Sequence, residues 1–166
     1  ANATIRNSKL GHQGINAIGS GTFTVENSTI YGRTLINLRS DYGSTWQGEF
    51  IIRDCVLVPA GGKPASPSLI GGSYSGQHDF GYTCYMPEKI TIENLRIDDS
   101  NHPADYQGPA IFSNFNPQMT GESYLEKFPY VITREVILRN VTTTSGKSLR
   151  ISDNPFMFRN VKVITD

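Results

Sequence analysis

The chain has 166 residues, which is enough for one domain with a substantial apolar core. Its 15 Lys and Arg residues balance its 15 Asp and Glu residues, so neither a nucleic acid nor an anionic membrane surface is expected as a partner. Two cysteines, Cys55 and Cys84, fit neither a disulfide framework nor a metal site, and no apolar run approaches the roughly 20 residues that span a bilayer.

Six segments share one pattern: apolar, any, apolar, charged, Asn or Asp, any, any, apolar. The alternation on each side of the amide predicts two short strands, each with one buried face, and the Asn or Asp forms a corner between them. β-Branched and aromatic residues are frequent in these segments and we find no helix pattern, so an all-β chain is expected. The segments, in chain order, are 3–10, 23–30, 50–57, 90–97, 136–143 and 156–163.

A third strand is predicted in each gap between these segments. A repeated β unit with one amide at a fixed place is typical of a stacked solenoid, in which the corner side chains form a ladder. The charged residue before each corner alternates in sign until the last pair, which predicts a ladder of ion pairs that fixes the register. The expected third strands are 14–18, 35–39, 68–72, 110–114 and 148–152. The charged residues are Arg6, Glu26, Arg53, Glu93, Arg139 and Arg159.

With this repeated corner asparagine, the chain resembles the right-handed parallel β-helix of the pectin-lyase-like superfamily. The resemblance implies a three-sheet solenoid, here of about five to six coils. No capping helix is visible beside the first or last repeat, so we expect uncapped ends in a single domain, 1–166, that is a segment of a longer protein. Missing coils or an oligomer partner would then cover the ends. The superfamily also implies an extracellular or cell-surface location in a bacterium or phage.

The long insertions all follow the third strand, at 40–49, 75–89 and 116–135. Loops stacked at one edge of a rigid sheet form the wall of a cleft. Aromatic side chains beside Asp, Arg and His are the composition expected of a sugar-binding groove, although the same aromatics equally suit packing of each loop on itself. The residues predicted to bind substrate are Asn37, Tyr42, Trp46, Tyr82, Tyr85, Asn114 and Arg150.

Four residues of the first two insertions and the strand before them are the catalytic candidates. In lyases of the superfamily, carboxylates hold calcium against a uronate and a basic side chain removes the neighbouring proton. The resemblance therefore implies catalytic roles for Arg39, Asp41, His78 and Asp79, with Asp41 and Asp79 as the ligands of a possible cofactor, calcium. Lys89 is a further candidate for the base or the carboxylate anchor. Two carboxylates equally suit glycoside hydrolysis.

The sequence therefore predicts a carbohydrate-active protein, a lyase or a hydrolase, whose partner is an acidic or complex polysaccharide. Two alternatives stay open. One is a non-catalytic glycan-binding or adhesin module, which needs only exposed aromatic residues in a row. The other is a structural segment of a fibre or tailspike, which needs an apolar outer face with Ile51, Ile137 and Met157 as candidates.

Overall fold

The computed structural model describes residues 1–11, 15–38, 46–72, 83–115 and 130–166. Within these ranges the chain forms fourteen strands and no helix. The strands are β1 (Ala3–Arg6), β2 (Lys9–Leu10), β3 (Ile15–Ala17), β4 (Gly19–Glu26), β5 (Thr29–Tyr31), β6 (Thr34–Leu38), β7 (Trp46–Val58), β8 (Ser68–Gly72), β9 (Cys84–Tyr85), β10 (Lys89–Ile97), β11 (Ala110–Phe112), β12 (Tyr130–Val131), β13 (Glu135–Thr143) and β14 (Lys162–Thr165).

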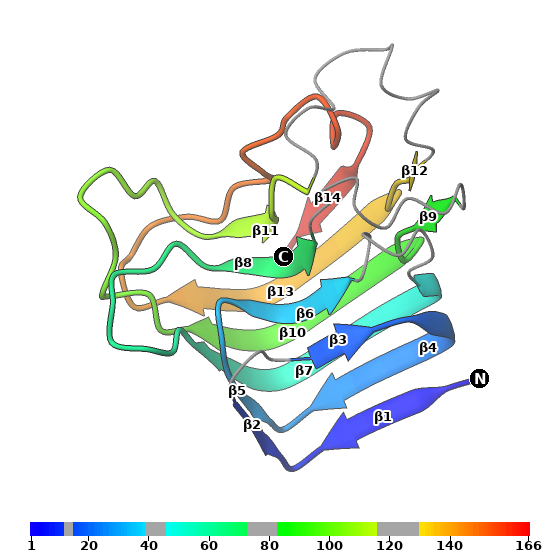
Figure 1. Ribbon diagram of the computed structural model, residues 1–166, viewed down its shortest axis with the longest axis horizontal. Helices are drawn as coiled ribbons and strands as arrows, with labels where there is room; N and C mark the ends of the chain where they lie inside the picture. The colour runs from blue at the N-terminus through cyan, green and yellow to red at the C-terminus, as the bar shows by residue number, and fades with distance from the viewer. Residues whose placement is uncertain (12–14, 39–45, 73–82, 116–129) are drawn as a thin grey trace.

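The described strands form three parallel sheets. The largest has eight strands, with β1-β4-β7-β10-β13-β14 side by side and β2 and β5 attached beyond the corners. A four-stranded sheet has the order β11-β8-β6-β3, and β12 pairs with β9 in a two-stranded sheet. Figure 1 shows the four-stranded sheet in front of the large one, with β9 and β12 beside the starting ends of β10 and β13.

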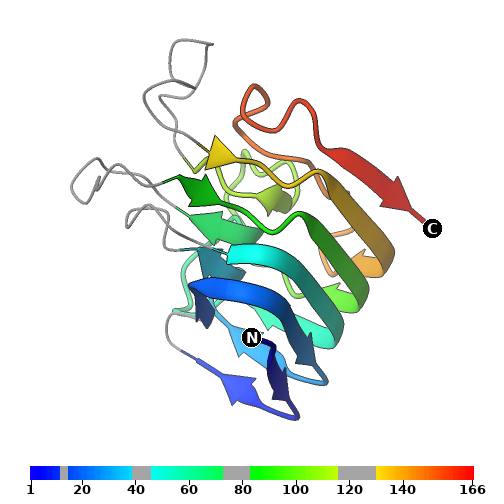
Figure 2. The same ribbon diagram turned by 90° about the vertical axis from the view of Figure 1, so that its right-hand side faces the viewer.

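The predicted three-sheet solenoid of five to six coils is wrong. The strands before and after each corner belong to one eight-stranded sheet, and β7 runs from Trp46 to Val58 through its corner at Asp54. The reason is that the corner residue turns the strand without ending the hydrogen-bond ladder: the Asn27 N–H still donates to the Arg53 carbonyl, and the Val56 N–H donates to Ser28. One sheet therefore bends where two sheets were expected, and Figure 2 shows the bend as a common curve of the long strands.

The predicted third strands fare better. Four of them coincide with β3, β6, β8 and β11, which together form the four-stranded sheet. The fifth, at 148–152, is reduced to a single bridge between Arg150 and Ala110. The sixth repeat is also misplaced, because residues 155–160 form turns. Phe158 stacks on Phe112 with ring centroids 4.4 Å apart instead of lying beside Leu138, where the repeat places it and where Thr165 lies.

The core lies between the large sheet and the four-stranded sheet. The inward positions that the alternation predicts are buried: Phe50, Ile52 and Leu57 have no exposed surface, and Cys55 is 2% exposed. Burial raises the pKa of the Cys55 thiol, and Cys55 and Cys84 form no disulfide in the described part of the chain. Parallel pairing in register stacks like residues from strand to strand, so each inward position forms a continuous apolar row.

Five of the predicted corners have the same backbone conformation. Asn7, Asn27, Asp54, Asn94 and Asn140 have φ values of 54°, 47°, 56°, 54° and 51°, in the left-handed region that Asn and Asp tolerate better than other side chains. Their side chains form the expected ladder: Asn27 donates to Asn7 at 2.7 Å, Asn94 to Asp54 at 2.9 Å and Asn140 to Asn94 at 3.0 Å. The carboxylate of Asp54 has no N–H and cannot donate to the Asn27 side chain.

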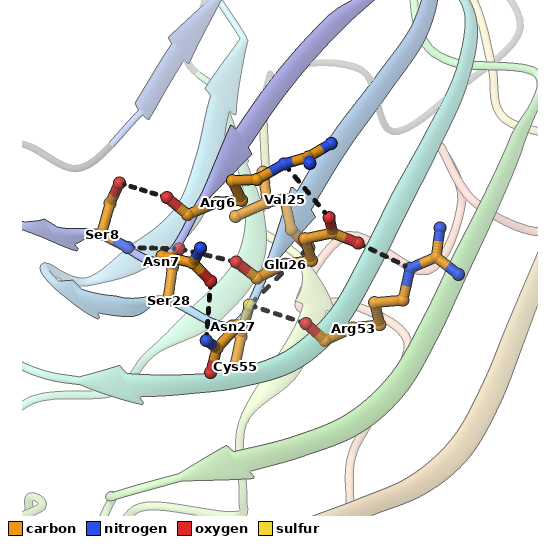
Figure 3. Close-up of polar contacts among 9 residues, drawn as sticks. All are labelled: Arg6, Asn7, Ser8, Val25, Glu26, Asn27, Ser28, Arg53 and Cys55. Atoms are coloured by element: carbon orange, nitrogen blue, oxygen red, sulfur yellow. Dashed lines mark hydrogen bonds and ion pairs between the residues drawn. The ribbon is translucent and has the colours of Figure 1, made fainter.

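The residue after the corner completes this local structure. The Ser28 hydroxyl donates to the carbonyl of Glu26 at 2.9 Å, and the Ser8 N–H donates to the Ser28 hydroxyl at 3.1 Å. Figure 3 shows these bonds together with the Cys55 thiol, which occupies the equivalent position on β7. The corner end of the large sheet is thus held by several hydrogen bonds per strand.

Candidate functional site

The charged residues before the corners form a row of ion pairs, which we call the paired row. Glu26 lies 3.4 Å from Arg6 and 3.3 Å from Arg53, and Arg139 lies 2.9 Å from both Glu93 and Asp166. Figure 3 includes the first three of these residues. The members of the paired row are Arg6, Glu26, Arg53, Glu93, Arg139 and Asp166.

The sign alternation of the paired row continues to its end, where the sequence predicted a break. The β13–β14 register places Thr165 beside Leu138, so Asp166 follows beside Arg139. Its two acidic neighbours raise the pKa of the Arg139 guanidinium, first through hydrogen bonds. Arg159, the predicted member, instead lies over the Phe156 ring at 4.0 Å. Each member of the paired row therefore forms an ion pair with at least one neighbour.

A second row of alternating charge lies at the opposite end of the same strands, and we call it the groove row. Each member lies four residues before a member of the paired row, so both rows project from the outer face of the sheet. In the described ranges, none of the four side chains makes a hydrogen bond or an ion pair, although each neighbours an opposite charge in register. The groove row consists of Glu49, Lys89, Glu135 and Lys162.

The groove row lines an open groove of about 710 Å³ that crosses β4, β7, β10, β13 and β14. An exposed ion pair between Arg134 and Glu88 adds two more charges to the wall. Gly48 forms part of the lining with φ at 139°, and a Cβ there would lie 2.0 Å from the Gly21 carbonyl oxygen. The Glu88 N–H donates to the Gly48 carbonyl at 2.7 Å. Close backbone packing thus fixes this part of the groove.

A smaller pocket of about 390 Å³ adjoins the groove, because Gly48, Glu88 and Arg134 line both. Its other walls include the half-buried Tyr85 and Val131, which is 47% exposed. These two residues are paired in the β9–β12 sheet. The charged groove therefore continues into a surface with one aromatic ring and aliphatic side chains.

The β9–β12 sheet was not predicted, since both segments fall inside predicted insertions. A sequence signal existed. Cys84 pairs with Tyr130, and these residues are 46 positions apart, the same separation as Asn94 and Asn140. Equal spacing of short apolar runs could have revealed the extra pairing.

Trp46, a predicted substrate-binding residue, lies in the core and is 5% exposed. Its ring contacts Phe23 at 5.3 Å and Phe50 at 5.7 Å between centroids, and its Nε1–H donates to the Gly21 carbonyl at 2.9 Å. A buried ring that packs against two phenylalanines has no exposed face for a sugar. The expected stacking role of Trp46 does not fit this position. Met157, a candidate for the fibre's outer face, is likewise buried at 3% exposure.

Other predicted substrate-binding residues lie away from the groove. Asn37 donates to the Asn16 side chain at 3.0 Å on the four-stranded sheet. Arg150 donates to the Asp153 carboxylate at 2.6 Å and to the Gly108 carbonyl at 3.1 Å. Asn114 is exposed, and its carbonyl accepts a hydrogen bond from Asn154. Among the described substrate-binding candidates, Tyr85 is the one beside the groove.

The remaining candidates, Arg39, Asp41, Tyr42, His78, Asp79 and Tyr82, lie outside the described residues. Their catalytic and binding roles, and calcium binding by Asp41 and Asp79, stay predictions. The described part of the chain holds no cluster of three metal-ligating side chains. Its described residues also include no helix of the length and apolar character needed to cross a bilayer.

A separate cluster surrounds Asp99, which has no exposed surface. Its carboxylate accepts hydrogen bonds from the Tyr106 hydroxyl at 2.6 Å, the Ser145 hydroxyl at 2.7 Å and the Ser145 N–H at 2.9 Å. Burial acts to raise the pKa of the Asp99 carboxyl, but the hydrogen bonds outweigh it and hold the pKa below 3.8. Burial and Asp99 together raise the pKa of Tyr106. With its acceptor sites filled from within, this cluster fixes two loops together.

Comparison of the chain with models of protein families, with curated proteins and with solved structures found no significant match. The resemblance to the pectin-lyase-like superfamily therefore stays a prediction. The functional argument rests on the geometry and charge of the groove.

Proposed function

We propose that this protein binds an acidic or complex polysaccharide in the groove lined by Glu49, Lys89, Glu135 and Lys162. The observation that carries the proposal is the difference between the two charged rows. In the paired row, opposite charges neutralise one another. In the groove row, side chains of opposite sign lie on neighbouring strands but form no ion pair in the described part of the chain. They line an open groove of about 710 Å³.

The side chains of the groove suit a charged sugar. An ammonium group binds a carboxylate through charge-assisted hydrogen bonds, and a carboxylate accepts hydrogen bonds from hydroxyl groups. Tyr85, in the adjoining pocket, offers an aromatic surface on which the apolar face of a sugar ring can pack. An extracellular or cell-surface location in a bacterium or phage is part of this proposal, since such polysaccharides are found there.

Turnover of the polysaccharide by a lyase or hydrolase is the second candidate. It is favoured by the position of Lys89 between Glu49 and Glu135 in register, which places acidic and basic groups along one groove. Residues 39–45 join β6 to β7, and residues 73–82 join β8 to β9. The predicted catalytic residues in these stretches are thus linked by the chain to strands that border the groove and its adjoining pocket.

Calorimetric titration with a panel of acidic and neutral polysaccharides tests the proposed binding. Lys89→Gln should weaken binding of an acidic polysaccharide about tenfold or more, the effect of losing one charge-assisted contact. Lys63→Gln is the matched control, because Lys63 is an exposed lysine outside the groove lining. Absence of binding to every polysaccharide, or equal effects of the two variants, would contradict the proposal.

The same panel tests turnover. Formation of unsaturated uronides, read by ultraviolet absorbance with and without calcium, indicates a lyase, and new reducing ends without that absorbance indicate a hydrolase. Binding without either product identifies a non-catalytic binding module.

A further inference from the structure

The spacing of like charges in the groove row indicates the repeat length of the ligand. This inference rests on the proposed polysaccharide binding. We propose that the ligand is a polysaccharide in which an anionic sugar alternates with a sugar that offers hydroxyl or N–H donors. The polymer crosses the strands of the large sheet, with its carboxylates at Lys89 and Lys162 and its donor sugars at Glu49 and Glu135.

The first argument is the distance between like charges. The order β7-β10-β13-β14 separates Lys89 from Lys162 by one intervening strand, which carries Glu135. Since neighbouring strands lie about 4.8 Å apart, backbone positions of the same sign repeat about every 10 Å. That repeat is comparable with the length of a disaccharide in an extended polysaccharide. A polymer with one carboxylate per disaccharide therefore matches the lysines without bending.

The second argument is repulsion. In a polymer with a carboxylate on every sugar, two carboxylates could contact Lys89 and Lys162. The carboxylate on the sugar between them would then lie opposite Glu135. Like charges held together in a partly buried groove oppose binding, and such repulsion is a common source of specificity. Glu135 is half-buried and has no described positive partner to neutralise it. Glu135 is therefore expected to select against uniformly acidic polymers.

The third argument separates the groove row from the paired row, which has the same alternation. Arg139 already contacts Glu93 and Asp166 at 2.9 Å, so a ligand would have to displace existing ion pairs there. At the groove row no described ion pair has to be broken. The strand order gives both rows the same charge repeat. The ligand is expected to bind at the groove row, because its charges are not already in ion pairs.

Calorimetric titration with three probes tests the inference: hyaluronan oligosaccharides with a uronate on every second sugar, polygalacturonate oligosaccharides with one on every sugar, and dextran with none. We expect hyaluronan tetrasaccharide to bind about tenfold or more tightly than a polygalacturonate oligomer of equal length. A hyaluronan disaccharide can contact one lysine and should bind more weakly than the tetrasaccharide. Lys162→Gln should remove this gain with length.

Glu135→Gln provides the sharpest test, because it removes the repelling charge without a large change of volume. It should strengthen polygalacturonate binding several-fold and leave hyaluronan binding unchanged or weaker, while the control Lys63→Gln alters neither. If polygalacturonate binds as tightly as hyaluronan to the unmodified protein and Glu135→Gln changes nothing, the repeat inference is wrong and polysaccharide binding stands. If dextran binds as well as both, or none of the three binds, the charge-based inference fails. Only binding that is insensitive to Lys89→Gln, or lack of binding across the wider panel, overturns the proposed function.

Discussion

The paired row and the groove row differ in what surrounds them, although both alternate in sign on the same strands. The paired row adjoins the corners, where an amide ladder and backbone hydrogen bonds fix the register of the strands. The charged side chains there form ion pairs. The groove row lies at the other end, where the sheet meets the stretches that connect it to the smaller sheets. In the paired row, the alternating charge supports the parallel register through ion pairs. Whether it also forms a binding surface depends on whether the charges are neutralised from within.

Gly48→Ala should have the largest effect on the free energy of unfolding, because it attacks the backbone on which the groove is built. The added Cβ would lie 2.0 Å from the Gly21 carbonyl oxygen, and φ at 139° is itself unfavourable for alanine. We expect a loss of about 3 kcal/mol or more by urea denaturation. Gly61→Ala is the control: φ is 95° but nothing lies within 4 Å of its Cβ, so a loss of about 1 kcal/mol is expected. Equal losses would show that the close packing at Gly48 is unimportant.

Asn94→Ala tests the corner end of the large sheet, whose amide ladder and ion pairs we expect to stabilise the fold without contacting the ligand. Asn94 donates to Asp54, accepts from Asn140 and has φ at 54°. Loss of two hydrogen bonds and a less favourable backbone should reduce the free energy of unfolding by about 2 kcal/mol, without changing the affinity for polysaccharide.

The matched control for this corner is Asn160→Ala, because Asn160 follows the same sequence pattern but lies in a turn. Its effect should stay within about 0.5 kcal/mol. If the two variants are equally destabilised, either the ladder contributes nothing or the sixth repeat has been wrongly excluded from it.

Asp99→Asn should reduce the free energy of unfolding by about 2 kcal/mol near neutral pH, because a buried amide cannot accept all the hydrogen bonds from Tyr106 and Ser145. The folded pKa of Asp99 lies below its ordinary value of 3.8, so the carboxylate stabilises the folded state above about pH 4. This stabilisation is lost as the pH falls through the folded pKa. The difference between the variant and the unmodified protein should therefore shrink below pH 4. Asp105→Asn, at an exposed position, is the control and should change the free energy of unfolding by less than about 0.5 kcal/mol.

Much of the fold followed from alternation and spacing. Three features lie where the sequence predicts them: the five corners with left-handed φ, the inward rows around Phe50 and Ile52, and the strands of the four-stranded sheet. Each depends on local parity, which a sequence records directly. The sheet bend at Asp54 was not predictable in this way, because a turned strand that keeps its ladder and one that breaks it have the same alternation.

The errors have identifiable causes. Residues 156–163 match the repeat pattern, but the packing of Phe158 on Phe112 is a tertiary contact that overrides it. Trp46 was assigned to an exposed loop, although it lies four residues before Phe50 and shares its inward parity. The same extension of parity reveals the groove row, since Glu49 and Lys89 lie four residues before Arg53 and Glu93 and carry the opposite sign. Lys89 was a candidate for the base or the carboxylate anchor, and it lies in the groove. The groove as a whole was not predicted, because aromatic side chains are the usual sequence sign of a sugar-binding surface and the groove row has none.

The smallest predicted effect separates the two rows most directly. Glu26 bridges Arg6 and Arg53, so Glu26→Gln should lower the free energy of unfolding by about 0.5–1 kcal/mol at low ionic strength. Glu49, its counterpart in the groove row, has no described partner, and Glu49→Gln should change stability by less than about 0.3 kcal/mol. At 1 M salt the effect of Glu26→Gln should largely disappear, because the screening length falls to about 3 Å. Affinity should show the reverse order, with hyaluronan binding altered by Glu49→Gln and not by Glu26→Gln. If Glu49→Gln is the more destabilising of the two, the groove row is itself a structural ladder, and the distinction on which the binding proposal depends is lost.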